Sequence, residues 1–314
     1  MNKIFTGKYS QAQVMMTLSA IAYIPFDSIP SLQDNLNSAE ALENKYEVIW
    51  CAGDEAGLVY AVRNIVTRDY TIVIRGAVFQ FGLAFLFDWY EDLDMGRLSS
   101  LPHSELAVAK VASGILDNVR EVNDLTCDGK TLKQLVNNFP TGSKVYITGH
   151  SLGGTIASVY AAELACSNIP GLNIIPYIFG APTAGNPAFA ELFQPASNYC
   201  LFPESFWYVN SLDTIPYAWH DLQGIPGVDY GKIKCPIDLV LCLDNLTRLL
   251  ILAGVTYAQP AFVQQLPGQL RQSDNFFGEA MYQHQHNTYL HLMGLNPVLS
   301  TAFSYRREQE KAFS

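Results

Sequence analysis

Three apolar segments near the start of the chain are separated by short polar turns. Residues 46–53, 57–64 and 69–76 are rich in valine, isoleucine and aromatic residues, which favour β-strands. The turn between the first two segments reads DEAG at 54–57, and polar, glycine-containing turns of this kind are typical of hairpins. The pattern therefore predicts three successive strands, of which the first two form a hairpin.

After about residue 104 the spacing of apolar residues changes from that of strands to that of helices. Helical spacing from about 104 to 122 is seen at Leu106, Val108, Val111, Ile115 and Val119. Farther along, helices are predicted at 131–139 and 152–165, and strands at 144–150, 172–182 and 205–211. This order predicts an α/β fold with a central, mostly parallel sheet covered by helices on both faces. Since the chain has no internal repeats and no Gly/Ser-rich linkers, residues 1–314 are expected to form a single domain.

The first residues of the chain combine features of a signal peptide with features of an ordinary helix. An early lysine, an apolar patch and an A-x-A sequence at 20–22 fit a signal peptide. However, polar residues at 6–13 leave an apolar region too short for one, so we expect a helix capped near Ser10. The predicted compartment is therefore the cytoplasm, or the outside after export without a cleaved signal. The longest apolar stretches, 77–87 and 246–262, do not qualify as transmembrane segments.

The overall charge excludes one class of partner. The formal net charge is -10 and only 15% of the residues are charged. Such a chain gains little from releasing counterions, so nucleic acid is excluded as a partner, whereas hydrophobic contact with lipid remains open. The six cysteines lack zinc-site spacing and are expected to be mostly small buried apolar residues, with disulfides left open for an exported protein.

The most specific chemical signal is the sequence GHSLG at 149–153, which fits G-x-S-x-G. It follows a predicted strand and precedes a predicted helix, as a nucleophile elbow requires. In such a turn the glycines avoid clashes and the serine hydroxyl, here that of Ser151, is pushed out at the carboxyl edge of the sheet. The Leu152 N–H at the start of the helix points to where an oxyanion would form. Ser151 is therefore the candidate nucleophile.

A serine nucleophile needs a histidine base and an acid, which follow it in this chain order. Asp213 comes just after the predicted strand 205–211 and is the candidate acid, with Asp221 and Asp229 as rivals on loop-like sequence. The base must follow this aspartate in the chain, and His220 is poorly placed for that role. The candidate bases are therefore the three histidines of YQHQHNTYLHL at 282–292, which are His284, His286 and His291. A metal site built from these three is the alternative, although no supporting acid motif accompanies them.

Several further segments resemble the class 3 lipases, the fungal-type lipase family of the α/β-hydrolase superfamily. TIVIRGA at 71–77 and FDWYEDLDMG at 87–96 are similar to that family's R-G-[T/S] and D-W-x-x-D-L-D segments. IFGAPTAGNPAFAELF at 178–193, YVNSLDTIPY at 208–217 and HNTYLHLMG at 286–294 resemble its F-G-x-P-x-x-G-N, V-N-x-x-D and H-x-x-Y segments. The matches follow the family's order over most of residues 14–294.

The resemblance implies an α/β-hydrolase-type fold and a triad of Ser151, Asp213 and His286. His286 is preferred because it precedes Tyr289 by three residues, as in H-x-x-Y, and His284 is its rival. The resemblance also implies an oxyanion hole formed by the N–H groups of Leu152 and Ala77. Two departures are visible: the family usually has Thr or Ser where Ala77 stands, and often H-x-G-F where VASGI stands at 111–115.

Two segments are expected to shape the site of such an enzyme. Residues 78–89, VFQFGLAFLFDW, occupy the position of the family's lid and are strongly apolar, although a buried helix would have the same composition. Residues from about 235 to 265 are longer than the family needs and read as a helical insertion whose leucines pack over the acyl site or a partner.

The leading hypothesis is a serine carboxylic ester hydrolase that cleaves apolar acyl esters such as acylglycerols. Its Ser–Asp–His chemistry uses an acyl-enzyme and needs no metal or organic cofactor. Its partner is a lipid or another apolar ester, at a lipid–water interface. The alternatives are a phospholipase A1 or lysophospholipase, an aryl esterase, and a catalytically silent homologue that binds lipid or protein.

Overall fold

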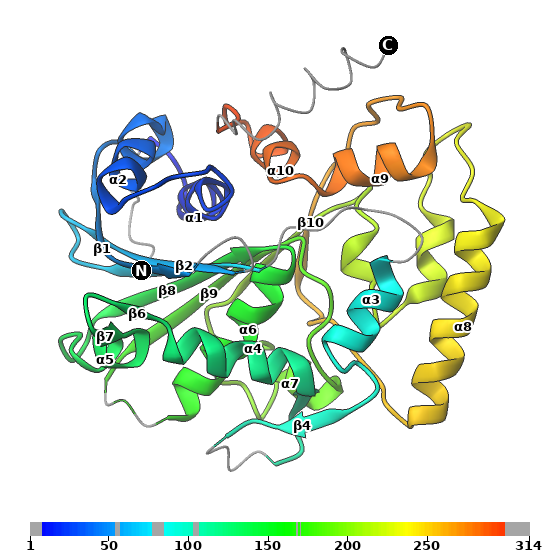
Figure 1. Cartoon of the computed structure of the whole chain (residues 1–314), viewed down its shortest axis with the longest axis horizontal. Helices are drawn as coiled ribbons and strands as arrows, with labels where there is room; N and C mark the ends of the chain where they lie inside the picture. Colours follow the sequence, from blue (N-terminus) through cyan, green and yellow to red (C-terminus); the bar gives the residue numbers. More distant parts are fainter. Residues whose placement is uncertain are drawn as a thin grey trace.

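A seven-stranded mixed sheet forms the centre of the molecule (Figure 1). The computed structural model describes residues 8–53, 57–76, 85–102, 107–167, 169 and 171–298. In spatial order, the strands are β1 (Tyr46–Gly53), β2 (Leu58–Asn64), β3 (Tyr70–Arg75), β8 (Lys144–His150), β9 (Asn173–Phe179), β10 (Phe206–Asn210) and β11 (Val263–Leu266).

The strand directions confirm the expected α/β fold. β1, β2 and β3 are antiparallel, whereas β3, β8, β9, β10 and β11 run parallel. All six predicted strands are present, and their ends differ from the predicted ones by at most three residues. β11 was not predicted, because its sequence VQQL is half polar and it pairs only at the edge of the sheet, with β10. The carboxyl ends of the parallel strands form one edge, where α/β proteins place their reactive groups.

One face of the sheet is covered by helices from both ends of the described chain (Figure 1). These are α1 (Gln11–Ile21), α2 (Ile29–Ser38), the short 3-10 helix η1 (Glu40–Leu42) and α10 (His286–Leu292). The predicted cap at Ser10 is confirmed, because its side chain accepts from the Gln13 N–H and the Gln13 side chain accepts from the Ser10 N–H. Every residue from Val14 to Ile21 is buried, so α1 is a part of the hydrophobic core.

The opposite face carries four helices, α4 (Ser113–Asp124), α5 (Leu132–Asn137), α6 (Leu152–Cys166) and α7 (Pro187–Glu191). Two small hairpins accompany them, β4 (Leu98–Ser100) with β5 (Lys110–Ala112), and β6 (Thr126–Cys127) with β7 (Lys130–Thr131). The helix predicted from about 104 begins only at Ser113. Residues 110–112 pair with β4 instead, and the Ala112 N–H donates to the Ala184 carbonyl, so tertiary pairing overrides the helical spacing.

The remaining elements flank the carboxyl edge of the sheet. They are α3 (Phe85–Asp92), the 3-10 helices η2 (Ile215–Tyr217) and η3 (Leu222–Gly227), α8 (Ile237–Ala253) and α9 (Phe276–His284). Figure 1 shows α3, α8 and α9 together on the right-hand side. α8 is the helix predicted within residues 235–265. Among the described helices, none has the length and apolarity to cross a bilayer.

Candidate active site

Ser151 lies in a strained turn between β8 and α6. Its backbone has φ 59° and ψ -136°, a conformation that non-glycine residues rarely adopt. The Ser151 N–H donates to the Phe179 carbonyl at the end of β9, which ties the turn to the neighbouring strand. The turn therefore holds the serine at the carboxyl edge of the sheet, as a nucleophile elbow does.

The two glycines of the motif are required by close backbone approach. A Cβ at Gly149 would lie 2.4 Å from the Gly153 carbonyl oxygen, and one at Gly153 would lie 2.3 Å from the Ile74 carbonyl oxygen. Both distances are far below a normal contact, so any other residue would push the turn away from β3. The spacing G-x-S-x-G is thus a packing requirement of this turn.

A chain of hydrogen bonds joins Ser151 to His284 and Asp213. The Nε2 atom of His284 lies 2.7 Å from the Ser151 hydroxyl oxygen. Its Nδ1 atom lies 2.8 Å from the Asp213 Oδ2 atom. Asp213 is fully buried, whereas His284 keeps about a tenth of its side chain exposed (12%). This is the geometry of a serine nucleophile with its base and acid.

The histidine beside Ser151 is therefore His284 and not His286, which corrects the prediction from the H-x-x-Y spacing. Two helices meet here, because α9 ends at His284 and α10 begins at His286. Gln285 between them is extended, with φ -63° and ψ 141°, so the two rings point in different directions. His284, the rival candidate to His286 in the sequence, is therefore the histidine in the site.

His286 packs instead against the ring of Tyr23. The two rings are stacked, with centroids 4.8 Å apart and planes 10° apart. The Nε2 atom of His286 is buried and makes no hydrogen bond within the described part of the chain. His291, the third histidine of the group, lies exposed on α10.

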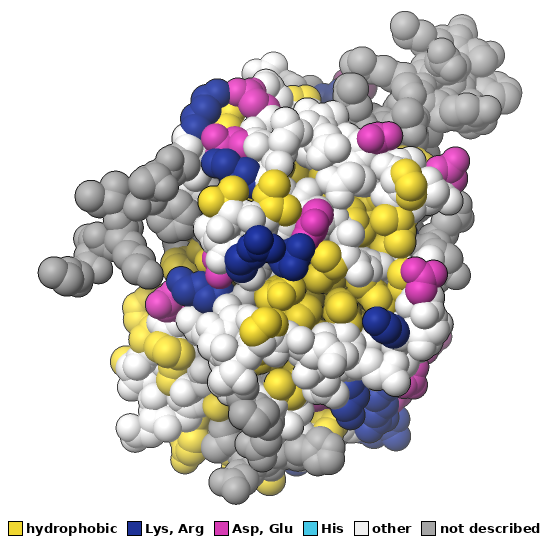
Figure 2. All heavy atoms as spheres, turned by 90° about the vertical axis from the view of Figure 1, so that its left-hand side faces the viewer, with side chains coloured by type: hydrophobic (Ala, Val, Ile, Leu, Met, Phe, Trp, Pro, Cys, Tyr) yellow, Lys and Arg dark blue, Asp and Glu magenta, His cyan; other side chains and the backbone are white. Residues whose placement is uncertain are grey.

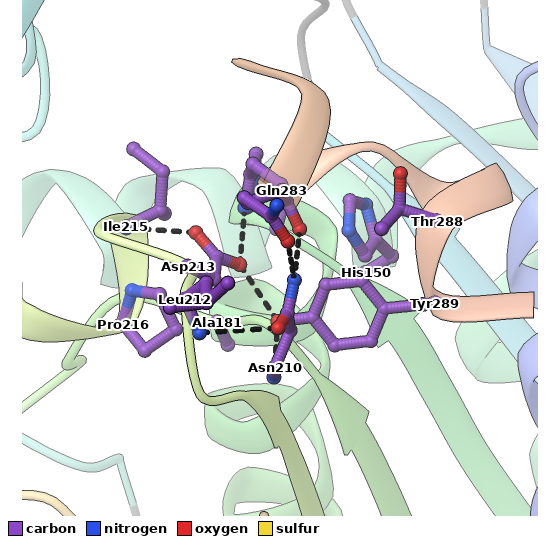
Figure 3. A network of polar contacts seen from close by, with 12 residues as sticks. His150, Ala181, Asn210, Leu212, Asp213, Ile215, Pro216, Gln283, Thr288 and Tyr289 are labelled. Atoms are coloured by element: carbon purple, nitrogen blue, oxygen red, sulfur yellow. Dashed lines mark hydrogen bonds and ion pairs between the residues drawn. The ribbon is translucent and has the colours of Figure 1, made fainter. Parts of the chain in front are cut away.

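Asp213 receives more hydrogen bonds than the one from His284 (Figure 3). Its Oδ2 atom also accepts from the Tyr289 hydroxyl at 2.6 Å, and its Oδ1 atom accepts from the Ile215 N–H at 2.9 Å. Burying a carboxylate is costly unless its lone pairs are satisfied, and these donors satisfy them. In the H-x-x-Y spacing Tyr289 marks only the position of a histidine, but its contact with Asp213 gives this tyrosine a role in holding the acid.

A buried polar network fixes the helix that carries His284. The Asn210 side chain donates to both the carbonyl and the side-chain oxygen of Gln283, each at 2.8 Å. The Gln283 amide in turn donates to the Glu279 carboxylate at 2.8 Å. Figure 3 shows Asn210 between Gln283 and Tyr289, beside Asp213. The residue that ends β10 is thereby tied to the last turn of α9, next to His284.

Glu279 completes this network as a buried carboxylate. It accepts the backbone N–H groups of Arg271 and Ser273 at 2.9 and 2.8 Å. Burial alone raises the pKa of Glu279, but the hydrogen bonds from Ser273, Gln283 and Arg271 outweigh it and lower that pKa. Glu279 is thus held as an anion inside α9. No sequence motif pointed to this network, since it depends on the meeting of β10 with α9.

The rival aspartates have local structural roles. Asp221 caps η3 by accepting the Gly224 N–H, and Asp229 accepts the N–H of Gly231 in a turn. The Nδ1 atom of His220 lies 3.0 Å from the Thr183 hydroxyl oxygen. Of the three aspartates considered, Asp213 is the one bonded to a histidine.

The predicted oxyanion hole falls partly outside the described residues. Leu152 is the first residue of α6, where a backbone N–H has no acceptor within its own helix. Ala77 is among the residues that the structure does not describe. Gly76, the residue before it, lies so close to Leu152 that a Cβ on Gly76 would be only 2.7 Å from the Leu152 Cγ atom. The end of β3 thus lies directly beside Ser151.

The segment predicted as a lid is described only at its end. Residues 78–84 lie outside the described part, and residues 85–89 form the first turns of α3. Leu86 and Trp89 are buried in the main core, with exposed fractions of 6% and 1%. This part of the segment is therefore a packed helix, as the buried-helix alternative has it.

No other arrangement in the described residues points to metal or redox chemistry. Groups of three or more His, Cys, Asp or Glu side chains that could hold a metal ion are absent there. No disulfide joins any of the six cysteines, all of which lie in the described part of the chain. The three clustered histidines thus serve separate purposes, one beside Ser151, one against Tyr23 and one at the surface.

The position of His286 predicts a measurable dependence of stability on pH. Burial, together with the nearby His284, lowers the pKa of His286 to about 4. Below about pH 6.5 the unfolded chain therefore binds a proton that the native chain does not bind until about pH 4. The free energy of unfolding thus decreases as the pH is lowered through that window. Between about pH 7 and about pH 5 we expect the wild type to lose more stability than His286→Gln, by up to about 2 kcal/mol. Urea unfolding of both proteins at the two pH values measures this, and equal losses in both would contradict it.

Comparison with known proteins shows what this site and fold resemble. The family model described as "Lipase (class 3)" matches residues 72–221, which include Ser151 and Asp213 but end before His284. A lipase of Rhizomucor miehei is 34% identical over 137 residues, 43% of this chain and 36% of that protein. Secreted mono- and diacylglycerol lipase 1 of Fusarium solani is 27% identical over 227 residues, 66% of this chain and 62% of its own length. The chain thus spans less than two thirds of each of these curated relatives.

A solved structure extends the likeness to nearly the whole fold. The crystal structure of M37 lipase superimposes with a TM-score of 0.76 and covers 91% of this chain and 93% of its own. The sequences are 21% identical in that alignment, so the likeness concerns the fold. The arrangement of the sheet and its flanking helices therefore follows an architecture already known.

Proposed function

Because the chain belongs to the class 3 lipase family, we propose that it is a serine carboxylic ester hydrolase that cleaves apolar acyl esters such as acylglycerols. The single observation that carries the proposal is the hydrogen-bonded series of Ser151, His284 and Asp213. A catalytically silent homologue would have no need to keep a buried carboxylate, a histidine and a strained serine in this geometry.

The first half of the proposed reaction acylates Ser151. His284 Nε2 takes the proton from the Ser151 hydroxyl while its oxygen attacks the ester carbonyl carbon. The carbonyl oxygen becomes an oxyanion, which the Leu152 N–H at the start of α6 stabilises, and Ala77 is proposed as the second donor. The tetrahedral intermediate then expels the alcohol, which receives the proton from His284. Asp213 holds the imidazole in the required tautomer and stabilises its charged form.

The second half releases the acid. A water molecule gives a proton to His284 and attacks the acyl carbon, and a second oxyanion forms in the same place. Collapse of this intermediate breaks the bond to Ser151, whose oxygen regains the proton from His284. The products are one carboxylic acid and one alcohol, and the cycle consumes one water. The proposed cycle uses no metal and no organic cofactor.

The proposed substrate class follows from relatives and composition. The Fusarium solani relative is by its name a mono- and diacylglycerol lipase. The segment 78–89 is strongly apolar in sequence and so suits an acyl chain rather than a polar group. A panel of acylglycerols and phospholipids of several chain lengths, tested below and above the aggregation threshold, separates the lipase from the phospholipase A1 activity.

Covalent labelling tests the proposal directly. A fluorophosphonate ester reacts with a serine that has been activated by a histidine, so we expect one phosphonyl group per protein, on the Ser151 peptide. Hydrolysis of p-nitrophenyl butyrate should disappear in step with labelling. Ser151→Ala should take up no label, while Ser167→Ala, changed at the end of the same helix, should label as the wild type does. Hydrolysis that persists in the fully labelled protein would refute the assignment.

A further inference from the structure

The outer face of α8 is a large exposed apolar surface on the side of the molecule that carries the proposed active site. We propose that this face lies flat on the lipid–water interface and holds the enzyme on its aggregated substrate. The inference rests on the proposed function, because it takes the lipid surface to be where the substrate is. It concerns residues that make no contact with Ser151, His284 or Asp213.

The exposed side chains are unusually large for a protein surface. The five on α8, with their exposed fractions, are Ile237 (68%), Leu241 (54%), Leu249 (36%), Ile251 (71%) and Leu252 (83%). Phe262, shortly after the helix, is exposed to 62%. Single exposed leucines are ordinary, but five exposed leucines and isoleucines on one helix mark a surface that meets an apolar phase.

These outer residues are not needed to hold the helix in place. The inner face of α8 is already buried in the main core through Leu239, Cys242, Leu243, Leu246 and Leu250. On its flank, the Gln223 amide of η3 donates to Asp244 and to Thr247. Since packing is complete on one side, the leucines and isoleucines on the other side contribute nothing to folding that polar residues would not.

The charge of the face suits an uncharged lipid surface. Only three of the seventeen residues of α8 are charged, namely Asp238, Asp244 and Arg248. Asp244 accepts a hydrogen bond from Gln223 and keeps its charge, so two negative charges and one positive charge give α8 a net charge of only -1. The whole chain, by contrast, carries a formal charge of -10. This face therefore avoids the repulsion that the rest of the molecule would meet, and it suits neutral or zwitterionic lipids.

The placement of α8 connects this face with the proposed site. Four residues beyond its C-terminal end, the Tyr257 hydroxyl donates to the Met95 carbonyl at 2.7 Å, in the turn after α3. Its middle rests on η3, which follows η2 and Asp213 in the chain. In Figure 1, α8 forms the outer edge of the molecule beside α3, on the side of α9. Lipid that contacts α8 is thus close to the elements that surround Ser151.

The opposite flank of the molecule differs in charge. There, beside α2 and β1, apolar side chains also reach the surface, but Lys and Arg side chains lie among them (Figure 2).

α8 is 17 residues long, or about 25 Å, and its apolar residues are distributed from one end to the other. Such a helix lies in the plane of an interface and does not span it.

The test compares vesicle binding of two matched triple variants. The first carries Ile237→Gln, Leu241→Gln and Leu252→Gln. The control carries Ile65→Gln, Val66→Gln and Val108→Gln, which are exposed to 46%, 65% and 58% and lie away from α8. Binding is measured by sedimentation with vesicles of dioleoylphosphatidylcholine that contain a minor fraction of dioleoylglycerol. Ser151→Ala is present in every protein, so that no lipid is consumed.

We expect the α8 variant to bind these vesicles roughly a hundredfold more weakly than the parent, and the control variant to bind within about twofold. With Ser151 restored, the α8 variant should hydrolyse dissolved p-nitrophenyl butyrate at the wild-type rate but an emulsion of trioctanoin much more slowly. Unchanged vesicle binding would overturn the proposal. A wild-type dimer that the α8 substitutions convert to a monomer would also overturn it, because the face would then bind a second copy.

The outcomes separate this inference from the proposed function. A wild-type protein that binds the vesicles through α8 but hydrolyses no ester would refute the proposed hydrolase activity and would leave lipid binding through α8 standing. A protein that hydrolyses p-nitrophenyl butyrate but binds no vesicles would refute lipid binding through α8 and would leave the proposed hydrolase activity standing.

Discussion

Replacing His284 with alanine is expected to lower kcat for p-nitrophenyl butyrate by about 10⁴-fold, whereas His286→Ala should keep most of the activity. The reason is the position of the rings. Of these two histidines, His284 has its Nε2 atom 2.7 Å from the Ser151 hydroxyl, while His286 stacks on Tyr23. Without a base, Ser151 must lose its proton to water, and the acceleration that a positioned base provides is lost.

The His286 variant serves as the control for this experiment. Its ring contributes packing against Tyr23, so His286→Ala is expected to lower thermal stability and to leave kcat nearly unchanged at a temperature where it is folded. Circular dichroism on both variants separates loss of fold from loss of chemistry. If His286→Ala is inactive and His284→Ala active, the assignment of the base to His284 is wrong.

How far the sequence could predict this site depends on how local each feature is. The serine turn is specified by five consecutive residues, and its two glycines are demanded by contacts with β3 and α6. Asp213 was found in the same way, since it closely follows an apolar strand. Both positions depend on short stretches of chain with strong local preferences, which a single sequence displays.

The base could not be chosen in the same way, because two histidines two residues apart have the same local setting. What separates them is a break at Gln285, where α9 ends and α10 begins. That break is fixed by distant contacts. Asn210 on β10 holds Gln283, and the Tyr289 hydroxyl reaches Asp213. The H-x-x-Y spacing places its tyrosine near the acid correctly, but here the base lies two residues farther from it.

The same distinction explains the misses in the fold. β11 contains Gln264 and Gln265, and only its pairing with β10 makes it a strand. The helix predicted from about 104 loses residues 110–112 to β5, which pairs with β4. In both places a partner far along the chain decides the conformation. Propensity is a weak guide under these conditions.

Replacing Asp213 with asparagine is expected to lower kcat for the same ester by about 10³- to 10⁴-fold with the fold retained. Asp213 accepts on both oxygens: Oδ1 from the Ile215 N–H, and Oδ2 from His284 and Tyr289. An asparagine has one accepting oxygen and one NH₂ group, so it cannot satisfy both sides. The asparagine amide can therefore take two orientations, and each of them damages the site.

If the asparagine NH₂ faces His284, the ring must present a bare Nδ1 atom and carry its proton on Nε2. That nitrogen then donates to Ser151 and cannot accept its proton, so the base is lost. If the oxygen faces His284, the NH₂ opposes the buried Ile215 N–H, which leaves a donor unsatisfied at a cost of about 1–3 kcal/mol. The imidazolium also loses its neighbouring negative charge in either case.

The control is Asp221→Asn, because Asp221 only caps η3 through the Gly224 N–H and the asparagine oxygen can replace that acceptor. It should keep kcat within about twofold. The two variants are compared by kcat for p-nitrophenyl butyrate and by urea unfolding. A value for Asp213→Asn above about a tenth of the wild-type kcat would show that His284 keeps its working tautomer without the carboxylate. The hydrogen bonds from Tyr289 and Ile215 would then serve the stability of the strand end, and Asp213 would no longer count as part of the reaction.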